Sequence, residues 1–136
     1  MSNSNSKSLK WLSIFFVIHF IADITFAIPL MISPEKLLKL IGWTVVDPFA
    51  ARLVAAALFG IGIESLIGRH SSIASFKGML NLKIIWSFAA IISFIIAIFS
   101  DIESVPFGIY FALLVFVCFN ALWIYWRIKL NKLTSE

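Results

Sequence analysis

The sequence predicts an all-α integral membrane protein, an antiparallel bundle of four transmembrane helices with a short interfacial helix between the first and the second. Hydrophobic residues make up 61% of the chain, well above the roughly 45–50% that is typical of soluble domains. Only 13% of the residues are charged, and the apolar ones gather in four runs. Each run approaches the ~20 residues that cross a ~30 Å hydrocarbon core, and the runs lack the alternation of β-barrel strands.

The first element is a helix over residues 9–32, preceded by residues 1–8, "MSNSNSKS", whose polar composition predicts a disordered cytoplasmic tail. The helix has a basic start, as a signal peptide would. Its apolar stretch is nevertheless too long for a signal sequence, and "TFA" before Ile28 is a poor cleavage site. We therefore expect it to remain as an uncleaved membrane span.

The second element is a short amphipathic helix in "SPEKLLKLIGW". Ser33 is suited to the N-cap and Pro34 to the first helical position, while Gly42 is suited to ending the helix. The helix is amphipathic, because it sets Leu37, Leu38, Leu40 and Ile41 against Lys36 and Lys39. Trp43 follows as an interface anchor. We expect this helix to lie in the outer interface of the membrane.

The remaining spans are predicted at about residues 49–67, 80–100 and 105–127. The inner loop before residue 80 carries apolar residues at helical spacing, which favours an additional helical turn leading into the third span. The outer link "SDIESVP" is so short that the third and fourth spans must be antiparallel neighbours. Residues 9–132 thus form one domain, followed by a tail over 133–136.

The net charge of +4 is distributed unevenly along the chain. Eight of the eleven basic residues fall on one side of the predicted membrane: Lys7, Lys10, Arg69, Lys77, Lys83, Arg127, Lys129 and Lys132. By the positive-inside rule, both termini are then cytoplasmic, in a multi-pass protein of the cytoplasmic (plasma) membrane. Topology accounts for the basic balance, so a nucleic-acid partner is not needed.

The second span carries a ridge of small residues between two charges. Arg52, Ala56, Gly60, Glu64 and Gly68 repeat at intervals of four, so they follow one side of a helix. A small middle lets a neighbouring helix approach closely. The two charged ends lie about 18 Å apart along the axis, too far to pair with each other.

Depth in the membrane predicts other partners for these charges. Asp23 lies in the outer half of the first span, within reach of Arg52. Glu64 and Lys83 both lie toward the inner ends of their helices, so we expect an ion pair between them. Further hydrogen bonds and structural polar contacts are expected from Asn81, Ser87 and Asn120.

His19 and Asp23 are four residues apart, on one face of the first span. Such a pair inside a membrane can act as a proton relay, a ligand counter-ion or an acid–base pair, or it can fix helix packing. No metal site is expected, because His19, His70 and Cys118 lie far apart in the sequence and at different depths. The one cysteine, Cys118, cannot form an intramolecular disulfide.

Three motifs, "SPEKLLKLIG", "DPFAARLVAAALFGIGIESL" and "MLNLKIIWSFAAI", resemble the DoxX-like group of small four-helix membrane proteins. Some members of that group are membrane subunits of quinone-linked or thiol redox systems. This chain has no cysteine pair, which argues against a thiol role. No cofactor is evident from the residues, and the resemblance leaves a quinone open as one. The first span, "WLSIFFVIHFIADITFAIP", is less closely similar to the sterol isomerase and sigma-2 receptor group.

The sequence therefore favours a binding protein over an enzyme, and it predicts that the protein binds a small lipophilic molecule such as a quinone or lipid. We expect the cavity to be lined by His19, Asp23, Arg52 and Glu64. The chain could act in a homo-oligomer or as a subunit of a membrane complex. Three alternatives stay open: a proton-coupled transporter acting as an oligomer, a membrane enzyme of the sterol isomerase type, and a purely structural subunit.

Overall fold

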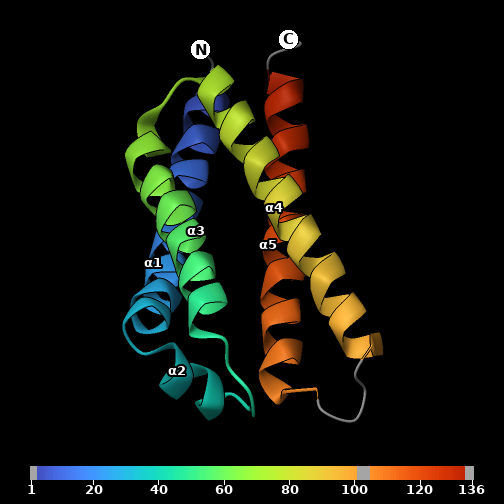
Figure 1. The fold of residues 1–136 in the computed structure, drawn as a ribbon. Coiled ribbons are helices and arrows are strands. Elements are labelled where there is room, and N and C mark those ends of the chain that lie inside the picture. The colour runs from blue at the N-terminus through green and yellow to red at the C-terminus, as the bar shows by residue number, and fades with distance from the viewer. Residues whose placement is uncertain (1–2, 101–104, 134–136) are drawn as a thin grey trace.

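The computed structural model describes residues 3–100 and 105–133 of the 136-residue chain. All regular structure in these residues is helical, as the sequence predicts (Figure 1). The elements follow in the order α1 (Asn3–Ile32), α2 (Pro34–Leu40), α3 (Pro48–Ile67), a 3₁₀ turn η1 (Gly68–His70), α4 (Ile73–Ser100) and α5 (Phe107–Leu133).

Four of these helices, α1, α3, α4 and α5, are long and apolar enough to cross a membrane. The prediction of four spans is thus confirmed, although the ends of the helices differ from the predicted ones. The third span begins at Ile73 instead of residue 80, because the loop ahead of it is helical, and Ser72 Oγ accepts from Ser75 N at its first turn. The fourth ends at Leu133, beyond the predicted residue 127.

The start of the chain also differs from expectation. α1 already begins at Asn3, within the segment 1–8 that we expected to be a disordered tail, and Ser8 is buried. Polar residues can extend a helix at its solvated end, where packing of the apolar span behind them supports the turn. The expected tail residues 1–2 and 134–136, and residues 101–104 of the outer link, lie outside the described residues.

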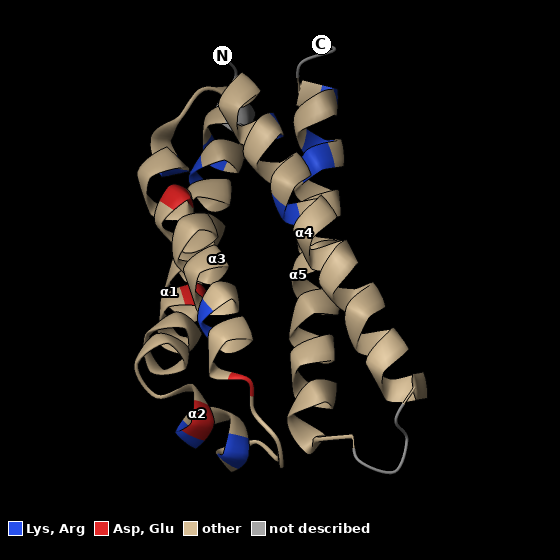
Figure 2. Cartoon of the chain, in the orientation of Figure 1, with Lys and Arg blue, Asp and Glu red and all other residues tan. Residues whose placement is uncertain are grey.

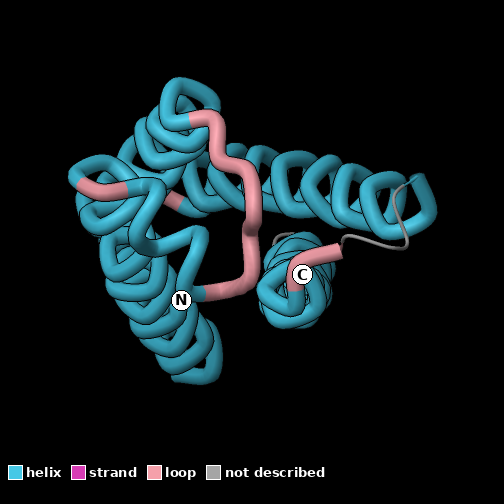
Figure 3. Tube along the Cα trace, turned by 60° about the horizontal axis from the view of Figure 1, so that its bottom comes forward, coloured by secondary structure: helices cyan, strands magenta, loops and turns pink. Residues whose placement is uncertain are grey.

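The four long helices pack in two pairs, α1 with α3 and α4 with α5 (Figures 1 and 3). The pairs are joined at the end of the bundle where α1 begins and α5 ends. Here an aromatic cluster links Phe16 of α1 to Phe76 of α4 and Trp123 of α5, with ring centroids 5.4 and 5.7 Å apart. From this junction the α4 helix diverges from α3 toward the other end of the bundle (Figure 1).

The interface of α3 with α1 consists of small side chains, but not those of the predicted ridge. The buried residues of α3 are Ala51, Ala55, Gly62 and Ser65. Ala56, Gly60 and Glu64 are exposed, and a Cβ added at Gly60 would have nothing within 4 Å. The close approach that the sequence suggested is real, but it uses the adjacent face of the helix.

The segment around α2 joins the two pairs at the end opposite the aromatic cluster. α2 ends at Leu40 with Ile41 as its C-cap, and Gly42, the residue predicted to end it, follows with a φ of 100° that is accessible mainly to glycine. Just before it, Ile41 O accepts a hydrogen bond of 2.9 Å from Gly108 N at the start of α5. Asp47 then caps α3 by accepting from Phe49 N and Ala50 N. The two helix pairs are therefore tied together at both ends.

The small-residue interface yields a prediction for two glycines on one helix. A Cβ at Gly62 would stand 2.8 Å from Asp23 Cβ, so Gly62→Ala must push α1 and α3 apart. Overpacking of this kind costs roughly 1–3 kcal/mol. Gly60→Ala is the matched control, and we expect it to leave stability unchanged or to raise it slightly because alanine favours the helix. Thermal unfolding in detergent measures both, and equal melting temperatures would contradict the α1–α3 interface.

Candidate functional site

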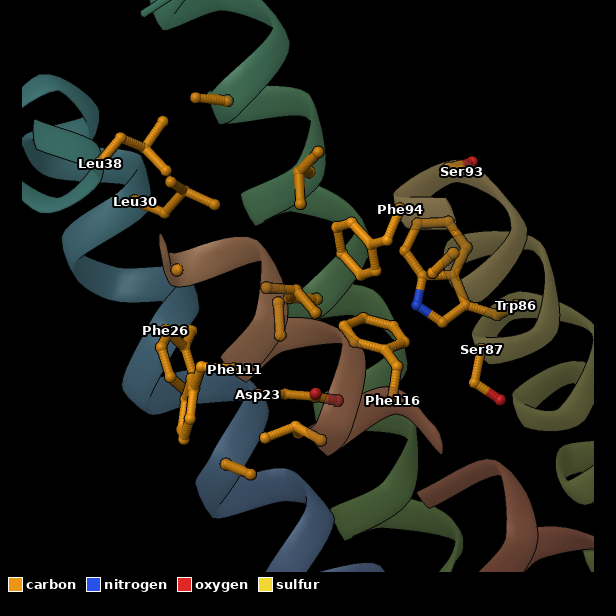
Figure 4. A pocket seen from close by; sticks show the side chains of 18 of the residues that line it. Asp23, Phe26, Leu30, Leu38, Trp86, Ser87, Ser93, Phe94, Phe111 and Phe116 are labelled. Atoms are coloured by element: carbon orange, nitrogen blue, oxygen red, sulfur yellow. The ribbon is translucent and has the colours of Figure 1, made fainter. Parts of the chain in front are cut away.

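A cavity of about 660 Å³ lies between the two helix pairs (Figure 4). All four long helices line it, together with α2 and the segment that follows it. The aromatic cluster closes one end, where its Trp123 lines the cavity, and Ile41, Trp43 and Gly108 lie at the other. The cavity is partly open to the surroundings of the bundle. Its size falls within the range of about 300–1,000 Å³ that is usual for small-molecule sites.

The walls of this cavity are apolar along most of its length. Aromatic side chains from α1, α4 and α5 line it, namely Phe26, Trp86, Phe94, Phe111, Phe116, Phe119 and Trp123. Figure 4 labels the first five of these. Polar side chains gather at the end near the aromatic cluster, where His19, Asp23, Lys83 and Ser87 line the cavity. We call these four residues and the adjacent buried Ser65 the polar end of the cavity. Two further polar residues line the cavity elsewhere, namely Asp47, whose carboxylate caps α3, and Ser93, whose hydroxyl donates to Ala89 O. A molecule inside would thus meet mainly apolar walls and one cluster of polar groups.

Lys83 is the central group of the polar end. It lies ten residues after the start of α4 and is only 3% exposed. Its Nζ donates to Ser65 Oγ of α3 at 2.5 Å and to His19 Nδ1 of α1 at 3.2 Å. The ammonium group also stands over the rings of Phe16 and Trp123, 5.1 and 5.3 Å from their centroids. These contacts supply the partners that a buried charge requires.

His19 lies between Lys83 and Asp23. Its Nδ1 is 3.0 Å from Asp23 Oδ2, so the pair expected from their spacing in the sequence is close in space. An ammonium group has only donors, so its bond to Nδ1 uses the nitrogen lone pair and places the histidine proton on the other nitrogen. Nδ1 then has no proton for the carboxylate. Accordingly, Asp23 Oδ2 is near the histidine and yet has no hydrogen-bond partner.

A second set of hydrogen bonds fixes α4 against α5 beside Lys83. Asn120 Nδ2 donates to Ser87 Oγ at 2.8 Å and to Ile84 O at 3.0 Å. Ser87 Oγ donates in turn to Lys83 O at 2.6 Å. Ser87 and Asn120 thus make structural polar contacts, although they do so within the α4–α5 pair and not with Glu64.

Arg52 and Glu64 do not line the cavity, contrary to the sequence-based expectation. Arg52 is exposed, and its Nε donates to Met31 O in the last turn of α1, where a cation is favoured by the helix dipole. The predicted contact between Asp23 and Arg52 is therefore replaced by a backbone contact. Asp23 instead lies beside Gly62, so the similar depth that the sequence suggested for Asp23 and Arg52 was wrong.

Glu64 is exposed on the outer face of α3. Lys83, its predicted ion-pair partner, instead bonds Ser65 and His19, which lie on the faces of α3 and α1 that meet. Asn81, the other expected partner, is exposed and accepts a hydrogen bond of 2.8 Å from Arg127 Nε of α5. Glu64 and Lys83 do border a small separate cavity of about 70 Å³, so they are neighbours without being an ion pair.

Ser65 is the member of the polar end that sequence reasoning missed. It is completely buried, and its hydroxyl donates to Ile61 O at 2.7 Å while accepting from Lys83. The sequence did contain a signal for Ser65, because it follows Gly62 by three residues on the face of α3 that carries small side chains. A lysine inside an otherwise apolar helix was the corresponding signal for the central role of Lys83.

The described residues contain no group of three or more histidine, cysteine or acidic side chains that could hold a metal ion. No family model, curated protein or solved structure matches the chain. The similarity to the DoxX-like group accordingly has no independent support. What is shown is a small multi-pass membrane protein, whose cavity is the basis for any functional argument.

Double-mutant cycles can test the arrangement around Lys83. We expect Lys83→Met and Ser65→Ala to be strongly non-additive, with a coupling of about 0.5–3 kcal/mol in the free energy of unfolding. The matched cycle pairs Lys83→Met with Glu64→Gln, and we expect a smaller coupling there because no hydrogen bond joins the two groups. A larger coupling with Glu64 than with Ser65 would show that the ion pair predicted from the sequence forms after all.

Proposed function

We propose that this protein binds a small lipophilic molecule, of the quinone or lipid class, in the cavity between its helix pairs. The observation that carries the proposal is the cluster of four polar side chains at one end of a mainly apolar cavity. Apolar walls with a few convergent polar groups are the general form of a small-molecule site. The tail of the molecule lies along the walls, and its head lies against His19, Asp23 and Lys83.

The cost of the polar end supports a role beyond packing. Ionisable side chains inside a membrane are expensive, and they mark binding sites or ion pathways more often than in soluble proteins. Lys83 and Asp23 both line the cavity. Ionisable side chains that served packing alone would instead be enclosed between helices. Arg52 and Glu64 are omitted from the proposed site, and Lys83 and Ser87 take their places.

The bilayer is the proposed source of the bound molecule. Lipophilic molecules concentrate in the membrane, and the cavity is partly open between helices that face it. Phe26 of α1 and Phe111 of α5 line the cavity and are 39% and 57% exposed. Their ring centroids are 6.5 Å apart, so the two rings are in contact and cover the cavity on this side, and a lipophilic molecule that enters between α1 and α5 must move them aside.

Filling the cavity should remove its occupant. Ala90 of α4 lines the cavity, so the large side chain in Ala90→Trp would take up space that the molecule needs. Ala97→Trp is the matched control, because Ala97 lies exposed on the same helix and does not line the cavity. We expect mass spectrometry of protein purified in mild detergent to find a defined lipophilic molecule, near one per chain, lost only in Ala90→Trp. Equal bulk lipid in all three proteins would contradict the proposal.

The distribution of charge supports a topology with both termini in the cytoplasm. α1 begins and α5 ends at the same end of the bundle, where lysine and arginine residues gather (Figure 2). The α2 end carries both signs of charge, with Glu35 and Asp47 beside Lys36 and Lys39 (Figure 2). By the positive-inside rule the basic end faces the cytoplasm of the plasma membrane, and α2 lies at the outer interface.

Reporter fusions test this topology. Green fluorescent protein fused after Glu136 should fluoresce, since it folds in the cytoplasm. Alkaline phosphatase fused after Val45, in the segment between α2 and α3, should be active, since it requires the outer compartment. The reverse pattern would mean that the bundle is inserted the other way round.

A further inference from the structure

One acceptor at the polar end has no donor, and this limits the kind of molecule that the cavity can hold. Among the described residues, two buried side-chain atoms lack a hydrogen-bond partner, Asp23 Oδ2 and Trp126 Nε1. Trp126 belongs to the aromatic cluster and does not line the cavity. The Asp23 side chain is only 10% exposed and does line it. Figure 4 shows the carboxylate pointing away from α1 into the cavity, toward Phe116.

The other polar groups beside Asp23 already have partners. Lys83 Nζ donates to Ser65 and His19, and its remaining surroundings include the faces of two aromatic rings. The Ser87 hydroxyl donates to Lys83 O and accepts from Asn120. With Nδ1 of His19 accepting from Lys83, the histidine has no proton there for the carboxylate, and the third N–H of Lys83 makes no hydrogen bond to Asp23 Oδ2. The polar end therefore lacks one hydrogen-bond donor, the one that would pair with Asp23 Oδ2.

From this we infer that the molecule held in the cavity is a neutral lipophile with a free hydroxyl group, which donates to Asp23 Oδ2. The inference rests on the proposed function and narrows its chemical class. A head with acceptors only, such as an ester or an oxidised quinone, would leave the carboxylate oxygen unpaired in an apolar site. An unpaired buried acceptor carries its full desolvation penalty, so acceptor-only heads are disfavoured.

Two kinds of head group could donate to Asp23, a neutral hydroxyl and a cationic ammonium group, and the charge of the site favours the hydroxyl. Lys83 Nζ lies 3.2 Å from the same His19 nitrogen that lies 3.0 Å from Asp23 Oδ2. A cationic head on the carboxylate would therefore stand close to the lysine ammonium in a site of low polarity. Like charges repel strongly there, whereas a neutral hydroxyl adds a donor without adding charge.

Direct binding of matched probes tests the inference on the full chain in detergent. Tritiated 1-dodecanol and tritiated dodecyl methyl ether share the same alkyl chain, and only the alcohol can donate. A hydrogen bond to a charged acceptor predicts that the alcohol binds at least about tenfold more tightly than the ether. Unlabelled dodecylamine, added as a competitor, should displace the alcohol less effectively than unlabelled dodecanol does.

Variants of Asp23 test whether a preference for the alcohol over the ether depends on this carboxylate. Asp23→Leu should abolish the advantage of the alcohol, and Asp23→Asn, which keeps the shape and loses the charge, should reduce it. Ser93→Ala is the control, because Ser93 lines the cavity away from Asp23 and its hydroxyl donates to Ala89 O. Ser93→Ala should keep the full advantage. If Asp23→Leu fails to fold, Asp23→Asn alone decides the assignment.

Each outcome supports or overturns a separate statement. Equal or tighter binding of the ether, or better competition by dodecylamine, overturns the inferred hydroxyl while leaving lipophile binding intact. A preference for the alcohol that persists in Asp23→Asn at full strength assigns it to another group and overturns the inference. If neither probe binds saturably and no molecule co-purifies, the proposed function itself fails.

Discussion

The burial of one lysine ammonium in the middle of an apolar helix is the constraint on which the rest of this structure depends. Lys83 belongs to the α4–α5 pair, yet both of its side-chain hydrogen bonds cross to the other pair, to Ser65 of α3 and His19 of α1. In a membrane there is no water to solvate the charge, so these partners must be held in place. The meeting of the two pairs is therefore polar at its centre and aromatic around it, where Phe16 and Trp123 face the ammonium.

The cavity follows from where the two pairs are joined. They touch through the aromatic cluster at one end and through the hydrogen bond from Gly108 to Ile41 at the other. Between these ends α4 diverges, and side chains line a cavity of about 660 Å³ instead of packing together. A bundle that was packed along its whole length would have no such space, because helix interfaces normally fill to the density of a protein interior. The short segment around α2 thus sets the outer end of the cavity.

The hydrogen bonds at the polar end show how a site gains chemical selectivity from an excess of acceptors. Ser65, Ser87 and Asn120 are satisfied by backbone or by each other, and this holds Lys83 in one orientation. His19 has a single nitrogen facing both Lys83 and Asp23, and it cannot accept from one and donate to the other at once. The acceptor that is left without a donor is therefore Asp23 Oδ2, and Asp23 lines the cavity. In water such a group would be solvated, but within a membrane protein it specifies a partner.

The sequence by itself determined the class of protein, the four spans, the short helix ended by Gly42 and the proximity of His19 and Asp23. These features depend on composition and on spacing within one helix, which are local properties of the chain. Only the tertiary structure decided that Lys83 meets Ser65 and His19, and that Arg52 and Glu64 lie outside the cavity. Successive residues of a helix are turned by roughly 100°, so the face with Ala51, Ala55 and Gly62 and the face with Ala56, Gly60 and Glu64 are adjacent and similar in composition. Which face is buried depends on the rotation of α3 about its own axis, and that rotation is set by the helix packed against it, where Asp23 Cβ requires the space left by Gly62.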